Sequence, residues 1–233
     1  MRLQLLGDSR DAFKWDCLHW LVSESEALDQ LVVVPMLCDD IPDSSEGQVP
    51  PDRFRSRPEI ALFLILLREE PRSFERIERL GCLEGLSHFN VLLYRRNRLL
   101  GYGWERATYW VDLLEHPPSR TVVFLDPDTG FEAISESGKL HLGFGEALAI
   151  CAAIGDQSVL AVYHHRGRGQ TWAEVLGRLW RNMPPHLNAR AIYGGDVALI
   201  LLGSPALLAG LDDPIRRYLA VHPQLRLSVD GGV

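Results

Sequence analysis

Short runs of branched apolar residues alternate with helix-type segments along this chain of 233 residues, and this alternation limits the fold more than any other feature. Strand-type runs begin at Leu31, Val122 and Val159, and each is apolar on consecutive residues. Such strands indicate a sheet that is buried on both faces, which is typical of parallel sheets covered by their crossover helices. We therefore predict a three-layer α/β fold with a mostly parallel, doubly wound sheet.

The last third of the chain adds a different signal. Residues 188–203 form two β-type runs, separated by Gly194, Gly195 and Asp196, which is a hairpin pattern. A final hairpin of this kind is found in the methyltransferase-like variant of the Rossmann fold, where the sixth and seventh strands pair at the sheet edge. The layout therefore predicts a C-terminal β-hairpin edge, by analogy alone.

The length of the chain suits one full hydrophobic core, so we expect a single α/β domain over residues 1–233, with a long loop at about 38–58. The longest apolar run, Ile60–Leu67, falls far short of the roughly 20 residues that a membrane span requires. The first residues lack the apolar stretch of a signal peptide. We expect a cytoplasmic protein without a membrane partner, and its oligomeric state stays open.

Charge composition gives two further hints. The net charge of −7 disfavours a protein that coats nucleic acid nonspecifically, although it leaves room for a local basic groove. Among the 24 basic residues only Lys14 and Lys139 are lysines. Because a compact ammonium binds differently from a planar guanidinium, these two positions are candidates for a specific role.

An acidic turn follows the strand-type run that ends at Leu125. It presents Asp126, Asp128 and Glu132, with Pro127 and Gly130 between them. Carboxylates held close together repel one another unless a cation offsets their charge, and hard ions such as Mg²⁺ or Mn²⁺ prefer oxygen ligands. The turn predicts a Mg²⁺ or Mn²⁺ site, and Lys139, a few residues on, would neutralise charge that develops during a reaction. A simple capped turn with a surface ion pair is the alternative.

A second group of polar residues follows the run that starts at Val159. His164 and His165 are neighbours and must point to opposite faces of a strand, so at most one of them can face the acidic turn. His165 is a candidate proton donor or acceptor, and Arg166 is a candidate phosphate ligand. A solvated basic turn is the alternative.

A third cluster lies near the amino terminus. Asp11 and Lys14 are three residues apart on one face of a predicted helix that follows Asp8. An ion pair at the start of a helix would explain them, and whether they share a pocket with Asp126 and Asp128 stays open at this stage.

Taken together, these islands resemble a family of uncharacterised bacterial and phage proteins. Members carry a GDxxDxxKW pattern, then FFDPDNGLE with a lysine after it, then a VYQH strand followed by an arginine. Thr129, Phe131 and His164 replace the usual Asn, Leu and Gln. The resemblance covers most of the chain in islands and implies no established activity. The matching residues are Gly7, Asp8, Asp11, Lys14, Trp15, Phe124, Asp126, Pro127, Asp128, Gly130, Glu132, Lys139, Val162, Tyr163, His165 and Arg166.

Three functions fit these patterns. The first is a metal-dependent phosphodiester hydrolase, similar to a nuclease, that acts on nucleic acid or a nucleotide, with the acidic turn holding the ion and Lys14, Lys139, His165 and Arg166 assisting catalysis. The second is an S-adenosylmethionine-dependent methyltransferase-like protein, in which Asp126 and Pro127 occupy the Asp/Asn-Pro turn of that fold. The missing glycine-rich loop after the first strand disfavours it. The third is a noncatalytic partner protein of a phage or defence module.

Overall fold

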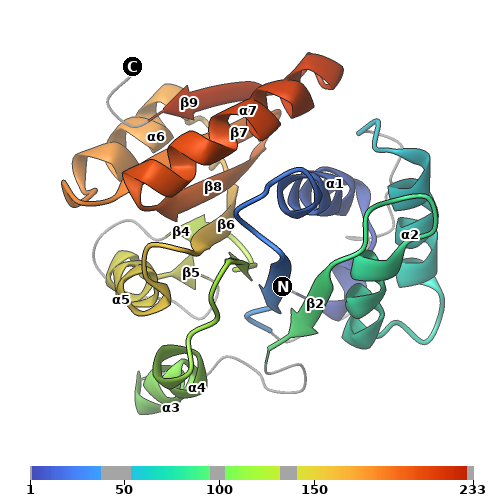
Figure 1. Cartoon of the computed structure of the whole chain (residues 1–233), viewed down its shortest axis with the longest axis horizontal. Coiled ribbons are helices and arrows are strands. Elements are labelled where there is room, and N and C mark those ends of the chain that lie inside the picture. Colours follow the sequence, from blue (N-terminus) through green and yellow to red (C-terminus); the bar gives the residue numbers. More distant parts are fainter. Residues whose placement is uncertain (1, 38–53, 95–102, 132–140, 230–233) are drawn as a thin grey trace.

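The computed structural model describes residues 2–37, 54–94, 103–131 and 141–229, and Figure 1 shows them as one α/β assembly around a central sheet. Within these residues the main sheet has seven strands in the order β2-β1-β3-β6-β8-β7-β9. They are β1 (Gln30–Val34), β2 (Asn90–Leu93), β3 (Thr121–Leu125), β6 (Val159–His165), β7 (Asn188–Gly194), β8 (Val197–Gly203) and β9 (Arg226–Val229).

Half of this sheet is parallel and half is antiparallel. Strand β1 pairs in parallel with β2 and β3, and β3 pairs in parallel with β6. Strand β8 runs antiparallel to both of its neighbours, β6 and β7, and β9 runs antiparallel to β7. The carboxyl ends of β1, β2, β3 and β6 therefore lie along the same edge of the sheet.

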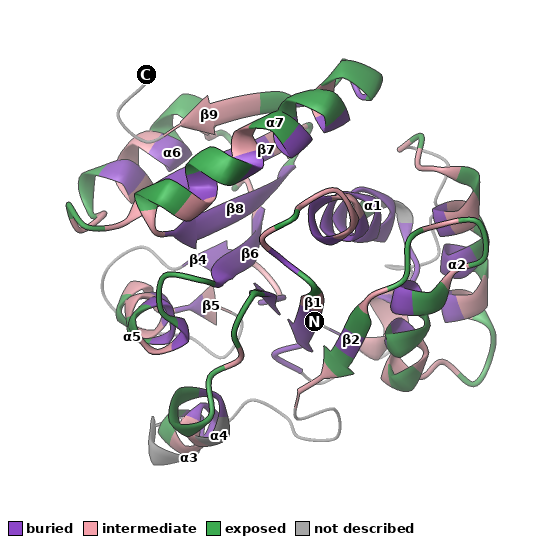
Figure 2. Ribbon diagram, in the orientation of Figure 1, coloured by how far each residue is buried: buried purple, intermediate pink, exposed green. Residues whose placement is uncertain are grey.

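The strands are buried on both faces, as their apolar runs predict. On β1, Leu31 and Val33 belong to one hydrophobic cluster, whereas Val32 and Val34 belong to the other. Figure 2 shows β8 coloured as buried over its length, in agreement with seven buried residues. Consecutive side chains of a strand point to opposite faces, so each central strand contributes to both cores.

One face of the sheet is covered by segments from both ends of the chain. The first residues form a short 3₁₀ turn, and α1 continues from it with residues such as Leu18 packed into the core. Helices α1 and α7 contact each other on this face (Figure 1). The covering elements are η1 (Leu3–Leu5), α1 (Ser9–Ser23), α2 (Pro58–Arg68), η3 (Phe74–Cys82) and α7 (Pro205–Val221).

The second core lies on the opposite face of the sheet. Trp110, Ile150 and Leu176 pack there against strand residues such as Val123 and Leu160. The elements on this face are α3 (Gly103–Tyr109), α4 (Val111–Glu115), α5 (Phe144–Ile154) and α6 (Trp172–Arg181).

The expected α/β class and the hairpin are confirmed, but the details of the sheet differ from the prediction. The β7–β8 hairpin forms, yet it is not the edge, because β9 adds to β7 on the outside. The sheet is also less parallel than expected, since β8 and β9 both reverse direction. A small parallel pair, β4 (Gly130–Phe131) with β5 (His141–Leu142), was not predicted. These strands are too short for a periodic pattern to reveal them.

None of the helices in the described residues is long and apolar enough to cross a membrane.

Candidate functional site

The three candidate clusters of the sequence meet at the carboxyl ends of β3 and β6. Gly7 adopts a φ of 82°, which turns the chain into α1, and the Asp8 carboxylate caps that helix by accepting from the Arg10 and Asp11 amides at 2.8 and 3.1 Å. A cavity of about 40 Å³ lies between this helix start and the two strand ends. We call it the inner cavity; its walls include Asp8, Asp11, Lys14, Asp126, Tyr163 and His165.

Lys14 is the central cation of the inner cavity. Its ammonium group donates to Asp126 Oδ2 at 2.7 Å and also pairs with Asp11, and its side chain is almost fully buried. Burial alone would lower the pKa of Lys14, but Asp11 and Asp126 outweigh burial and raise it above its ordinary value. Lys14 therefore stays charged and joins α1 to the end of β3.

A second ion pair closes the other side of the cavity. Arg2 donates to Asp128 Oδ2 at 2.9 Å, and both side chains are about nine-tenths buried. The segment before α1 thus lies over the turn that follows β3, and Leu5 and Leu6 complete the wall.

Asp8 is the fourth carboxylate of the inner cavity. Four carboxylates and three basic side chains line the cavity, and one of the basic side chains, Arg10, also pairs with Asp196 at 2.9 Å. Burial, followed by repulsion from Asp11, raises the pKa of Asp8 to about 6. A carboxyl group with a pKa near neutrality is suited to exchanging protons.

Two further side chains face the inner cavity from β6. The Tyr163 hydroxyl is buried and has no hydrogen-bond partner among the described residues, and burial together with Asp126 raises the pKa of Tyr163. Burial and nearby Arg10 lower the pKa of His165 to about 4, so its ring is neutral at neutral pH. A buried hydroxyl without a partner is costly unless something in the cavity satisfies it.

His164 points the opposite way and lines a second, larger hollow of about 600 Å³. Its Nδ1 accepts from the Phe131 amide at 3.0 Å, and burial lowers its pKa to about 4. We call this hollow the outer pocket; it also contains Phe131, His141, Phe144, Arg166 and Arg178. His165 lines both hollows, so they are neighbours.

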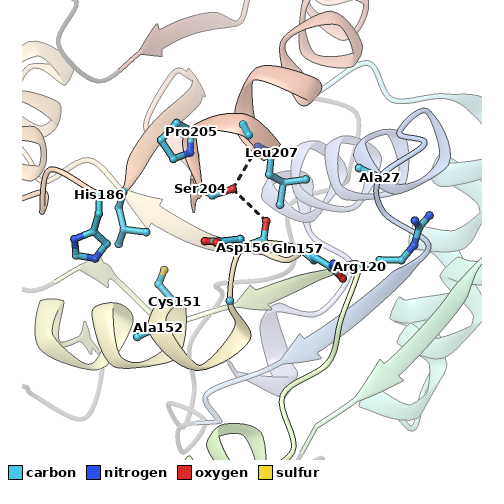
Figure 3. A pocket seen from close by; sticks show the side chains of 13 residues that line it. Ala27, Arg120, Cys151, Ala152, Asp156, Gln157, His186, Ser204, Pro205 and Leu207 are labelled. Carbon is cyan, nitrogen blue, oxygen red and sulfur yellow. Dashed lines mark hydrogen bonds between the residues drawn. The ribbon is translucent and has the colours of Figure 1, made fainter.

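A third hollow, of about 950 Å³, lies at the opposite end of the sheet, where the parallel strands begin. Figure 3 shows Ser204 there, which accepts from the Leu207 amide and donates to the Asp156 carbonyl oxygen. The first bond caps α7 and the second joins the cap to the segment before β6, and the wall mixes small and apolar side chains with a few polar ones. Because ligands of open α/β sheets bind at the carboxyl ends of strands, this hollow is a weaker candidate than the other two.

The predicted site residues divide between these places. Lys14, Asp126, Asp128 and His165 line the inner cavity, whereas Arg166 lines the outer pocket. Glu132 and Lys139 lie outside the described residues. Within the described ranges, no three His, Cys, Asp or Glu side chains are placed to hold a metal ion, and Asp126 and Asp128 each bind a basic side chain instead. The metal site stays a prediction.

Sequence reasoning missed residues of both hollows, and Arg2 and Arg178 are examples. Arg2 precedes the first recognisable motif, so no spacing pattern connects it to Asp128. Arg178 belongs to a helix whose periodicity indicates only an amphipathic surface. Tyr163 lies within the matched strand motif, but no role for its hydroxyl follows from the sequence.

No family model matches the sequence, and no curated protein matches it either. Among solved structures, the chain is similar to protein LPL1258 from Legionella pneumophila str. Philadelphia 1, of family DUF519. The two share 15% sequence identity with a TM-score of 0.40, over 97% of this chain and 98% of that chain.

Proposed function

We propose that the protein is a methyltransferase-like group-transfer enzyme that acts on a nucleotide or on nucleic acid. The observation that carries this proposal is the position of Asp126-Pro127 at the carboxyl end of β3, next to β1, in a sheet with β8 inserted antiparallel between β6 and β7. Doubly wound methyltransferases insert their seventh strand between the fifth and sixth in the same way, and they carry an Asp/Asn-Pro turn beside the transferred methyl group. The layering of helices on both faces also supports this assignment.

The charges of the inner cavity suit such chemistry in one respect. S-adenosylmethionine carries a sulfonium cation, and the cavity has four carboxylates against three basic side chains; at about 40 Å³, however, the cavity cannot enclose the cofactor and can only present this charge to it. The end of β1 fits less well, because Val34–Leu37 contains no glycine and Met36 is buried there with a φ of 47°. On the described residues, the cofactor contact expected at β1 is absent.

In this proposal, three residues of the chain act on the substrate or position it. Lys14 holds Asp126 in one position, so the carboxylate can accept a hydrogen bond from a substrate amine or hydroxyl without moving. Asp8, with a pKa of about 6, can take up the proton that such a group releases. The neutral His165 ring lies between this site and the outer pocket and can relay a hydrogen bond between them.

A metal-dependent phosphodiester hydrolase is the second candidate, and one observation favours it. Four aspartates line the inner cavity, and burial raises the pKa of one of them, Asp8, to about 6, so a proton or a cation such as Mg²⁺ or Mn²⁺ would neutralise it. Of the predicted ligands, Asp126 and Asp128 line the inner cavity but each binds a basic side chain, and Glu132 lies outside the described residues.

Calorimetric titration separates these candidates. S-adenosylmethionine, Mg²⁺ and Mn²⁺ are titrated in parallel against the wild type, Asp126→Asn and Asp128→Asn. The matched control is Asp29→Asn, because Asp29 forms an exposed ion pair with Arg120 at the other end of the sheet. We expect saturable S-adenosylmethionine binding that weakens at least tenfold in Asp126→Asn and is unchanged in the control.

Two results would contradict the proposal. Metal binding that depends on Asp126, without cofactor binding, would move the assignment to the hydrolase. If no ligand gives a heat of binding, the third predicted function, a noncatalytic partner protein, remains. Thermal melts of each variant exclude simple unfolding as the cause of lost binding, and Asp128→Asn serves if Asp126→Asn does not fold.

A further inference from the structure

We infer that the outer pocket is a nucleotide-binding site, in which aromatic rings hold a base and two arginines bind its phosphate. This inference rests on the proposed function and extends it, because it assigns the binding of that substrate to the pocket beside the inner cavity. Its evidence, however, comes from a different set of residues.

The place and size of the pocket suit such a ligand. It lies at the carboxyl end of β6, between the small β4–β5 pair and α6, where open α/β sheets bind ligands. Its volume of about 600 Å³ is within the range of small-molecule and cofactor sites, whereas the inner cavity, at about 40 Å³, has room for little more than one water molecule.

Part of the pocket wall is aromatic. The rings of Phe131 and Phe144 lie 6.0 Å apart, and the His164 ring lies 6.2 Å from Phe131. Burial keeps His164 neutral, and its Nδ1 is occupied by the Phe131 amide, which fixes the orientation of the ring. Rigid aromatic faces of this kind bind planar rings by stacking, whichever base is present.

The pocket lining also carries positive charge. Arg166 and Arg178 both line the pocket, and no aspartate or glutamate is among its described lining residues. Arg166 Nη1 donates to the Gln170 carbonyl oxygen at 2.6 Å, which holds the guanidinium in place, and its buried Nε has no hydrogen-bond partner within the described chain. In a chain with a net charge of −7, a hollow lined by two guanidinium groups and no carboxylate selects an anion.

The edge of a base would find polar partners in the same pocket. The side chains of Gln170 and Asn182 line it and offer amide groups, although Asn182 already donates to the Arg178 carbonyl oxygen at 2.8 Å. His165 then connects the pocket to the cavity of Asp126 and Lys14. The combination of a planar apolar surface, amides and guanidinium groups matches a nucleobase with a phosphate, either as a free nucleotide or as part of a strand.

Two arginines of α6 give a sharp test. Arg178 lines the outer pocket, whereas Arg181, three residues later on the same helix, is exposed and lies outside its lining. The wild type, Arg178→Ala and Arg181→Ala are titrated calorimetrically, without any cofactor, with AMP, GMP, CMP and UMP, with adenosine, with inorganic phosphate, and with a single-stranded oligonucleotide. All titrations are done at one fixed, near-physiological salt concentration.

We expect at least one nucleotide or the oligonucleotide to bind, with a dissociation constant at least tenfold higher in Arg178→Ala and within twofold of the wild type in Arg181→Ala. Binding of free nucleotides identifies a small-molecule substrate, and binding of the oligonucleotide alone identifies a strand. Equal affinity for adenosine would contradict the phosphate contact, and equal affinity for inorganic phosphate would contradict base recognition. Equal losses in both variants, or no binding at all, would overturn the inference.

Comparing nucleotide binding with S-adenosylmethionine binding distinguishes a failure of this inference from a failure of the proposed function. If the protein binds nucleotides but not S-adenosylmethionine, nucleotide binding in the outer pocket is supported and the methyltransferase-like function is contradicted. The reverse pattern would leave the reaction class standing with its substrate elsewhere.

Discussion

The two ends of the sheet differ in how deeply they bury an ion pair. At the carboxyl end, Lys14 and Asp126 form an ion pair with almost no exposed surface, whereas at the amino end Arg120 and Asp29 form a pair that is about half exposed. Buried ions are expensive to desolvate, and replacing them with apolar side chains often preserves or increases stability. Because such a cluster is costly to the fold, the Lys14 ion pairs at the carboxyl ends of the strands support the site proposed there.

Removing the buried cation tests this contrast most strongly. Lys14→Met would leave Asp11 and Asp126 facing each other without a counter-ion, and we expect a loss of about 3 to 5 kcal/mol in the free energy of unfolding. Arg120→Met at the amino end is the matched control, with an expected loss of about 1 kcal/mol or less. Urea denaturation measures both. Similar losses at the two ends would remove the distinction.

The pH dependence of stability gives the next largest effect. The pKa of Asp8 is about 6 in the folded protein and near 3.8 in the unfolded chain, so between these values the folded state holds a proton that the unfolded state has released. Asp8 therefore makes the protein less stable as pH rises from about 4 to 6. The histidines act with the opposite sign, because His164 and His165 titrate near 4 when folded and near 6.5 when unfolded.

Asp8→Asn isolates the Asp8 contribution and keeps a capping side chain. Relative to the wild type, the variant should gain stability on going from pH 4 to pH 7, by up to about 3 kcal/mol, since a pKa raised by about two units corresponds to about 1.4 kcal/mol for each unit. Urea denaturation at several pH values measures the difference. A difference that does not change with pH would show that Asp8 is not perturbed in the folded state.

The contrast between the ends was only partly visible in the sequence. The strand ends and the helix after Asp8 follow from the periodicity of apolar residues, which is a local signal. The candidate site residues follow from their positions after strand ends and, for Lys14 and Lys139, from the rarity of lysine in the composition. Lys14 pairs with Asp126, which is 112 residues away in the sequence. Arg2, just before η1, pairs with Asp128 in the turn after β3. Neither pair follows from the spacing of residues in the sequence. The outer pocket depends on how α6 lies against the β4–β5 pair, which is a tertiary effect that local patterns do not specify.

The amino end should tolerate substitution of its best-defined polar contact. Ser204 caps α7, so Ser204→Ala should cost about 1 kcal/mol, the usual value of a helix cap, and should leave every ligand titration unchanged. Thermal or urea denaturation measures the loss of stability, and calorimetry measures ligand binding. A loss of ligand binding in this variant would return the large amino-end hollow to consideration as the site.

The smallest expected effect on stability separates a structural role from a functional one within the carboxyl end itself. Tyr163→Phe removes a buried hydroxyl that has no partner in the described protein, so we expect the free energy of unfolding to change by about 0.5 kcal/mol or less. Tyr218→Phe is the control, because the Tyr218 hydroxyl bonds to the buried Asp16 carboxylate at 3.3 Å, and its loss should cost about 1 to 3 kcal/mol. If Tyr163 faces the cavity to meet a ligand, its substitution must weaken ligand binding while the control does not. A large stability loss in Tyr163→Phe would instead show that something inside the folded protein, such as an ordered water, already satisfies the hydroxyl, and the inner cavity would then be part of the structure and not of the site.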